Sequence, residues 1–219
     1  HHLIGGPVPQ WMITLSIVQS MMMIIPVAAF TVNQYQTLQG HLGALRDSPT
    51  LRFIGVGGLM YTASSFQGSI EALRSVNVVT HFTHYTVAHA HLGLYGFVTF
   101  VFFGAMYFTT PHITAREWPY PSMISAHFWL VSTGFAIYFV SLTIGGWLQG
   151  QAMLEAARPF MDSVAVTLPY LKGRSIGGAL MVLGHLVFAL HFVLLVTNFG
   201  PQRDKPALFR HLFGREVVS

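Results

Sequence analysis

Five long apolar stretches constrain the fold of this chain more than any other feature of its sequence. They cover residues 11–32, 51–73, 84–109, 122–149 and 175–199. Each is close to the roughly 20 residues that a helix needs to cross a bilayer. Lipid offers the backbone no hydrogen-bond partners, so a single spanning segment must form a helix. The pattern predicts an all-α integral membrane protein, a bundle of about five transmembrane helices in contact with membrane lipid.

The composition agrees with this prediction and excludes several kinds of site. Charged residues make up 8% of the chain, against about 25% in soluble domains. The net charge of +4 comes from residues in short loops between spans, so it does not indicate nucleic-acid binding. Cysteine is absent, which excludes disulfides, thiolate ligands and Fe–S clusters. Metal chemistry must therefore use the 12 histidines.

The ends and loops of the sequence give two further expectations. The chain starts at His1 without an initiator methionine or a signal peptide, so we expect residues 1–219 to be a fragment or processed piece of a longer protein. Residues 150–173 form the longest connection, where we expect a loop with a short surface helix. Basic residues favour the cytoplasmic side. Seven basic residues follow spans one, three and five: Arg46, Arg52, Arg116, Arg203, Lys205, Arg210 and Arg215. Four lie on the opposite side: Arg74, Arg158, Lys172 and Arg174. We therefore expect a cytoplasmic C-terminus.

A histidine-rich segment opens the third span and contains the strongest functional signal. Ionisable residues inside a membrane are costly and mark functional sites. His89 and His91 are two positions apart, so a helix points them about 200° from each other. They cannot chelate one metal, but each can ligate one of two cofactors on either side of the helix. The alternative is a pair of hydrogen-bonded core histidines. Gly93 and Gly96 allow a flat group to approach, which favours haem.

Other candidate residues flank this segment in the sequence. Arg74 can pair with a carboxylate such as a haem propionate, or can be an ordinary loop charge. The adjacent imidazoles of His1 and His2 suit copper, zinc or iron, although a tag remnant is the simple alternative.

Together these motifs resemble the C-terminal half of the catalytic subunit I of haem–copper oxidases, most of all the cbb3-type cytochrome c oxidase. The resemblance covers nearly all 219 residues, and its most specific element is a His pair followed by His-x-His roughly ninety residues later. The other matching motifs are Pro9-Gln10-Trp11, the loop 45–53, Ser65-Phe66-Gln67-Gly68, Arg74-Ser75-Val76-Asn77, His81-x-Thr83, His127-Phe128-Trp129 and Ile176-Gly177-Gly178-Ala179.

The resemblance implies a role for each candidate residue. His1 and His2 would ligate copper, His89 the high-spin haem, and His91 the low-spin haem, with Arg74 and His81 near the haem propionates. It further implies two b-type haems, and that residues 1–219 are the C-terminal part of a single membrane catalytic domain within a twelve-helix subunit of the bacterial inner membrane. That subunit would work with c-type cytochrome subunits, take electrons from cytochrome c, reduce O2 to water and translocate protons.

Some positions depart from the family pattern. Gln67 stands where the family usually has Glu, and His84 where it has Asp. The His-x-His motif is shared with nitric oxide reductase, which reduces NO to N2O at a haem and non-haem iron centre. A non-catalytic haem electron-transfer subunit is a further alternative, although it gives no reason for His1 and His2.

Overall fold

The structure is a computed structural model that describes residues 3–202. Within these residues the chain forms helices joined by turns and contains no strand, which confirms the all-α class. The helices are α1 Gln10–Met22, α2 Ile24–Leu38, α3 Leu42–Asp47, α4 Pro49–Glu71, α5 Arg74–Thr80, α6 His84–His91, the π-helix η1 Leu92–Thr99, α7 Phe100–Thr114, α8 Pro121–Leu154 and α9 Phe160–Val196.

The predicted apolar spans correspond to long helical segments of the bundle. By length and composition, four segments of the described chain can cross a membrane: Gln10–Leu38, His84–Thr114, Pro121–Leu154 and Phe160–Val196. The remaining predicted span, residues 51–73, corresponds to α4, which has 23 residues and packs against α2, η1 and α7. Polar residues such as Ser64, Ser65 and Gln67 lower the hydropathy of α4 and keep it out of the apolar set.

The structure corrects the predicted connection at residues 150–173. α8 continues to Leu154, and α9 already begins at Phe160, so most of the predicted loop is helix. Lys172 and Arg174 are exposed on the surface of α9. At 1.5 Å per residue the 37 residues of α9 extend about 55 Å, beyond the roughly 30 Å of a bilayer core. Charged side chains can therefore lie on this helix outside the apolar core.

The first predicted span is longer than expected and is broken once. The helical segment runs to Leu38 rather than residue 32. A single residue, Met23, separates the end of α1 at Met22 from the start of α2 at Ile24. Pro26 has no N–H to donate to the Met22 carbonyl, which explains a break one turn before the proline. The predicted first span is therefore divided into two helices close to this proline.

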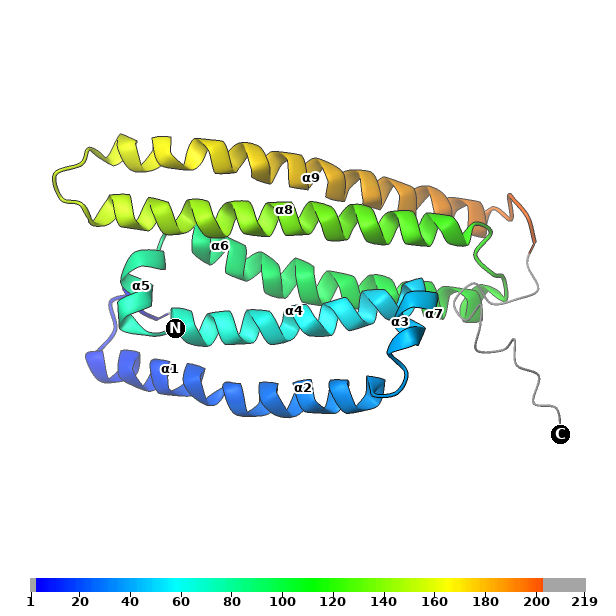
Figure 1. The fold of residues 1–219 in the computed structure, drawn as a ribbon, viewed down its shortest axis with the longest axis horizontal. Helices are drawn as coiled ribbons and strands as arrows, with labels where there is room; N and C mark the ends of the chain where they lie inside the picture. Colours follow the sequence, from blue (N-terminus) through cyan, green and yellow to red (C-terminus); the bar gives the residue numbers. More distant parts are fainter. Residues whose placement is uncertain (1–2, 203–219) are drawn as a thin grey trace.

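The helices form an elongated bundle (Figure 1). α8 and α9 lie side by side along it, and α6, η1 and α7 follow one another as a continuous helical segment next to α8 (Figure 1). α4 packs against this segment, with α1 and α2 beyond it (Figure 1). One end of the bundle contains α5 and the start of α6, and the opposite end contains α3 and the end of α7 (Figure 1). The histidine motif therefore lies in the half of the bundle near α5.

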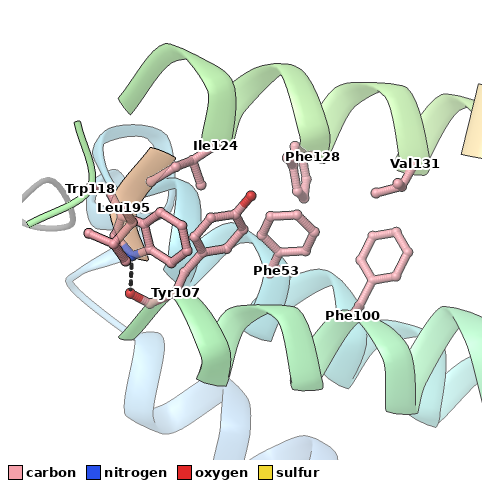
Figure 2. Close-up of a cluster of buried hydrophobic side chains, with 8 residues drawn as sticks. All are labelled: Phe53, Phe100, Tyr107, Trp118, Ile124, Phe128, Val131 and Leu195. Carbon is pink, nitrogen blue, oxygen red and sulfur yellow. Dashed lines mark hydrogen bonds between the residues drawn. The ribbon is translucent and has the colours of Figure 1, made fainter. Parts of the chain in front are cut away.

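The aromatic core fills the other half of the bundle. Figure 2 shows the buried cluster, in which the Phe53 ring lies between those of Tyr107, Phe100 and Phe128. Trp118 is fully buried and donates its indole N–H to the Tyr107 carbonyl at 2.9 Å (Figure 2). This hydrogen bond fixes the turn between α7 and α8 onto the end of the core.

Glycines set the closest approaches between helices. A Cβ added to Gly134 of α8 would lie 2.7 Å from the Gly177 carbonyl oxygen of α9, so the two backbones touch. A Cβ on Gly146 would overlap the backbone at Tyr85, because α8 crosses the start of α6 there. Small residues at crossings are typical of membrane bundles, where close packing drives association.

Candidate functional site

The histidine motif lies where an α-helix changes into a π-helix. α6 begins after Thr83, whose side-chain oxygen accepts a hydrogen bond from the Tyr85 N–H at 3.2 Å. His89 and His91 occupy its last turn, and the eight-residue η1 follows immediately at Leu92. π-helical turns are rare and occur frequently at functional sites.

His91 faces α8 and presents one ring nitrogen for binding. Its Nδ1 lies 2.8 Å from the Val87 carbonyl oxygen, which can only accept, so Nδ1 carries the proton and donates. In the neutral ring Nε2 then has the lone pair, and it accepts from the Tyr138 hydroxyl at 3.2 Å. A backbone carbonyl that fixes the tautomer is the usual partner of a metal-ligating histidine.

His89 belongs to a different face of the same helix. Thr86 and Gly93, at i−3 and i+4, lie on the same side as His89. Thr86 contacts α4 through a hydrogen bond of 2.6 Å to Glu71, and a Cβ on Gly93 would lie 3.2 Å from the Ser64 oxygen. The two ring positions are thus bordered by different helices, α4 near His89 and α8 near His91. Their roles as ligands stay predictions.

An apolar cavity of about 540 Å³ lies between α4, α8 and the α6–η1 segment. Tyr85 and Leu92, at i−4 and i+3 from His89, line it. Three buried polar atoms in its wall have no hydrogen-bond partner within the described residues: Gln67 Oε1, Ser132 Oγ and Thr143 Oγ1. A mostly apolar pocket of this size with a few polar groups is typical of a small-molecule site.

The described residues fit haem in their donor chemistry. They provide two imidazoles on different faces, one with its tautomer fixed, and glycines that leave room beside the helix. For copper, the predicted ligands His1 and His2 lie outside the described residues. Residues 3–202 contain no group of three or more His, Cys, Asp or Glu that could hold a metal ion.

Arg74 and His81 lie at the end of the bundle where α6 begins. The Arg74 guanidinium donates to the Thr14 hydroxyl at 2.9 Å, which ties α5 to α1. The His81 ring packs against Gly5, where an added Cβ would lie 2.7 Å from Nε2. Both side chains are thus near the N-terminal segment, and their predicted role with haem propionates stays a prediction.

The structure also contains a buried acid and a cluster of buried histidines that were not predicted from the sequence. Glu71 is 1% exposed, and an acidic residue inside a predicted span was the signal for it. The cluster lies deeper in the bundle, where Tyr95 and Tyr107 hydroxyls lie 2.9 Å from ring nitrogens of His185 and His127. His127 and the nearby His191 are fully buried.

The sequence of the chain is similar to those of known oxidase subunits. The family model described as cytochrome c and quinol oxidase polypeptide I matches residues 1–180. The cbb3-type cytochrome c oxidase subunit CcoN1 of Stutzerimonas stutzeri is 34% identical over 197 residues, covering 86% of this chain and 41% of the relative. Cytochrome c oxidase subunit 1 of Rhodobacter capsulatus is 32% identical over 205 residues, covering 90% and 38%. The chain thus spans about two fifths of the length of these relatives.

A solved structure has a fold similar to that of this chain. A haem–copper terminal oxidase dimer determined by cryo-electron microscopy superposes with a TM-score of 0.67 at 18% identity. The match covers 94% of this chain and 40% of that chain, and at this identity it shows the fold alone. The predicted resemblance to subunit I of the oxidases is confirmed by these matches. The chain belongs to the cytochrome c and quinol oxidase polypeptide I family.

Proposed function

We propose that this chain is the C-terminal part of the catalytic subunit of a cbb3-type haem–copper oxidase, one domain that includes residues 1–219. The complete subunit reduces O2 to water with electrons from cytochrome c and couples the reaction to proton translocation. The observation that carries this proposal is the His89-x-His91 motif, whose two positions are bordered by different helices beside an apolar cavity. The family membership supports the same function.

In this proposal His89 binds the high-spin haem and His91 the low-spin haem. Two b-type haems held by these residues would supply reversible electron uptake and a site for O2 reduction. The Val87 carbonyl holds the His91 ring through Nδ1, and Nε2, which accepts from the Tyr138 hydroxyl in this structure, is the nitrogen that would hold haem. Arg74 and His81 bind the propionates, and His1 and His2 bind copper. The c-type cytochrome subunits deliver the electrons.

The test is spectroscopic and needs the complete oxidase that contains this chain. Reduced-minus-oxidised spectra should show a low-spin haem and a second haem whose spectrum changes with CO. Metal analysis should give copper, and reduced cytochrome c should drive O2 consumption. Non-haem iron with NO consumption would instead identify a nitric oxide reductase. A haem protein without any CO-sensitive species would be a simple electron-transfer subunit.

We also propose that the subunit lies in the bacterial inner membrane with a cytoplasmic C-terminus. The basic residues Arg46 and Arg116 support this orientation, since both lie in the segments at the end of the bundle opposite α5. Protease added to right-side-out vesicles should leave the segment 203–219 uncut. Cleavage there without permeabilisation would reverse the proposed topology.

A further inference from the structure

Glu71, the last residue of α4, is the buried acid of the described chain. Its exposed fraction is 1%, and none of the other acidic residues in residues 3–202 is buried. A carboxylate is costly to bury in a membrane protein, so such residues mark functional sites. The C-terminal end of a helix carries partial negative charge, which further disfavours the ionised form at this position.

The hydrogen bonds around Glu71 accommodate either of its protonation states. The Thr86 hydroxyl lies 2.6 Å from Glu71 Oε1 and 2.9 Å from the Thr80 carbonyl oxygen. A hydroxyl has one proton, so it can donate to only one of these two oxygens. When Glu71 is ionised, Thr86 donates to the carboxylate. When Glu71 is protonated, the carboxyl donates to Thr86, and Thr86 donates to the Thr80 carbonyl.

The surrounding backbone is held in place in both states. The Thr80 carbonyl also accepts from the Thr83 hydroxyl at 2.7 Å, so it keeps a donor when Thr86 turns toward Glu71. The Asn77 amide donates to the Glu71 carbonyl at 3.1 Å and fixes the end of α4. Rotation of the Thr86 hydroxyl therefore reverses the direction of its hydrogen bond with Glu71 when the carboxyl gains or loses a proton.

This network lies beside the proposed haem ligand. Thr86 is three residues before His89 on the same face of α6, within about one helical turn. α1 contains no titratable side chain, and the other titratable groups of α4 itself, Arg52 and Tyr61, lie 19 and 10 residues before Glu71. The remaining titratable or charged side chains on the elements packed against this end of α4 are Arg74 and His81 of the α5 segment, His84, Tyr85, His89 and His91 of α6, and Tyr138 of α8.

We propose that Glu71 is a proton-binding site coupled to reduction of the haem that His89 holds. This inference rests on the proposed function. When a reduced c-type cytochrome delivers one electron to that haem, the Glu71 carboxylate takes up one proton from water and becomes a carboxylic acid. The proton offsets the added negative charge in a medium of low dielectric. On reoxidation the carboxyl releases the proton.

Infrared difference spectroscopy on the complete oxidase tests this proposal. The reduced-minus-oxidised spectrum should contain a positive carboxyl C=O stretching band that shifts in D2O. Glu71→Gln keeps the size of the side chain and should remove the band. Thr86→Val should keep the band and shift it to higher frequency, because the carboxyl loses its acceptor. Glu155→Gln is the matched control: this acid is exposed and pairs with Arg158, so the band should persist.

The outcomes separate this inference from the proposed function. A variant Glu71→Gln with both haems reducible and an unchanged carboxyl band would overturn the inference and leave the oxidase assignment intact. If the frequency of the carboxyl band is unchanged in Thr86→Val, the protonated carboxyl is not that of Glu71. A complex that binds no haem would contradict the proposed function, and the inference with it.

Discussion

Separate substitution of His89 and His91 tests whether they hold different haems. Because the two positions diverge by about 200°, each change should remove one haem and leave the other. His89→Ala should remove the CO-sensitive species and all turnover, while the low-spin haem is still reduced. His91→Ala should remove the low-spin spectrum, while chemical reduction still produces a CO-binding haem. In both variants the haem content should fall from two per subunit to one.

The structure sets the size of the accompanying loss of stability. His91 makes two hydrogen bonds, to the Val87 carbonyl and the Tyr138 hydroxyl, each worth about 1 kcal/mol. In the subunit without haem, where both hydrogen bonds are made, His91→Ala should therefore cost about 2 kcal/mol. Bound haem adds about 2.7 kcal/mol if present at a hundred times its dissociation constant. Spectra must accordingly be compared per folded protein and not per yield.

A matched control exists on the same helical segment. His112 of α7 makes the same contact as His91, with Nδ1 2.8 Å from the carbonyl oxygen four residues earlier. It is exposed, so His112→Ala should leave both haem spectra unchanged. If His89→Ala and His91→Ala remove the same spectral species, or if neither removes any, the two residues do not hold different haems and the proposed function fails.

Other substitutions test the packing and the local chemistry. Gly146→Val should unfold or strongly destabilise the bundle because α8 touches the α6 backbone, whereas Gly178→Ala, inside α9 with nothing within 4 Å, should keep or slightly raise the thermal stability. Trp118→Phe leaves the buried Tyr107 carbonyl without its donor and should lower the free energy of unfolding by about 1–3 kcal/mol in denaturant titrations. Tyr138→Phe should leave the low-spin haem spectrum intact, since the ligand nitrogen is then bound to haem; a lost spectrum would show that the hydroxyl is required.

The hydrophobic pattern was enough to predict the fold class, because lipid leaves a spanning segment few alternatives to a helix. It failed at residues 150–173, which it assigned to a connection although most of them are helical. Hydropathy records which residues avoid lipid, whereas a helix can continue past the bilayer with charged residues on its surface. It also placed the end of the first span six residues too early, since polar residues such as Gln34 and Gln36 continue α2.

The candidate site was predictable only in part. The spacing of His89 and His91 follows from helix geometry, so their divergence could be read from the sequence. Glu71 and Thr86 are 15 positions apart, and their contact depends on how α4 and α6 pack. The change to π-helical turns at Leu92 has no simple residue signature either, since Gly93 and Gly96 are equally compatible with an α-helix.

The paired glycines of α8 and α9 have a consequence for how the subunit is assembled. Gly134 and Gly177 bring the two backbones into contact, and only residues 155–159 connect the helices. Two helices joined so closely, with complementary surfaces, can enter the bilayer together as a hairpin during synthesis. This hairpin requires no cofactor. The contact between α4 and α6, by contrast, lies beside the proposed haem ligand His89 of α6. We therefore expect a subunit synthesised without haem to retain the α8–α9 pair and to become susceptible to proteolysis first between α4 and α6.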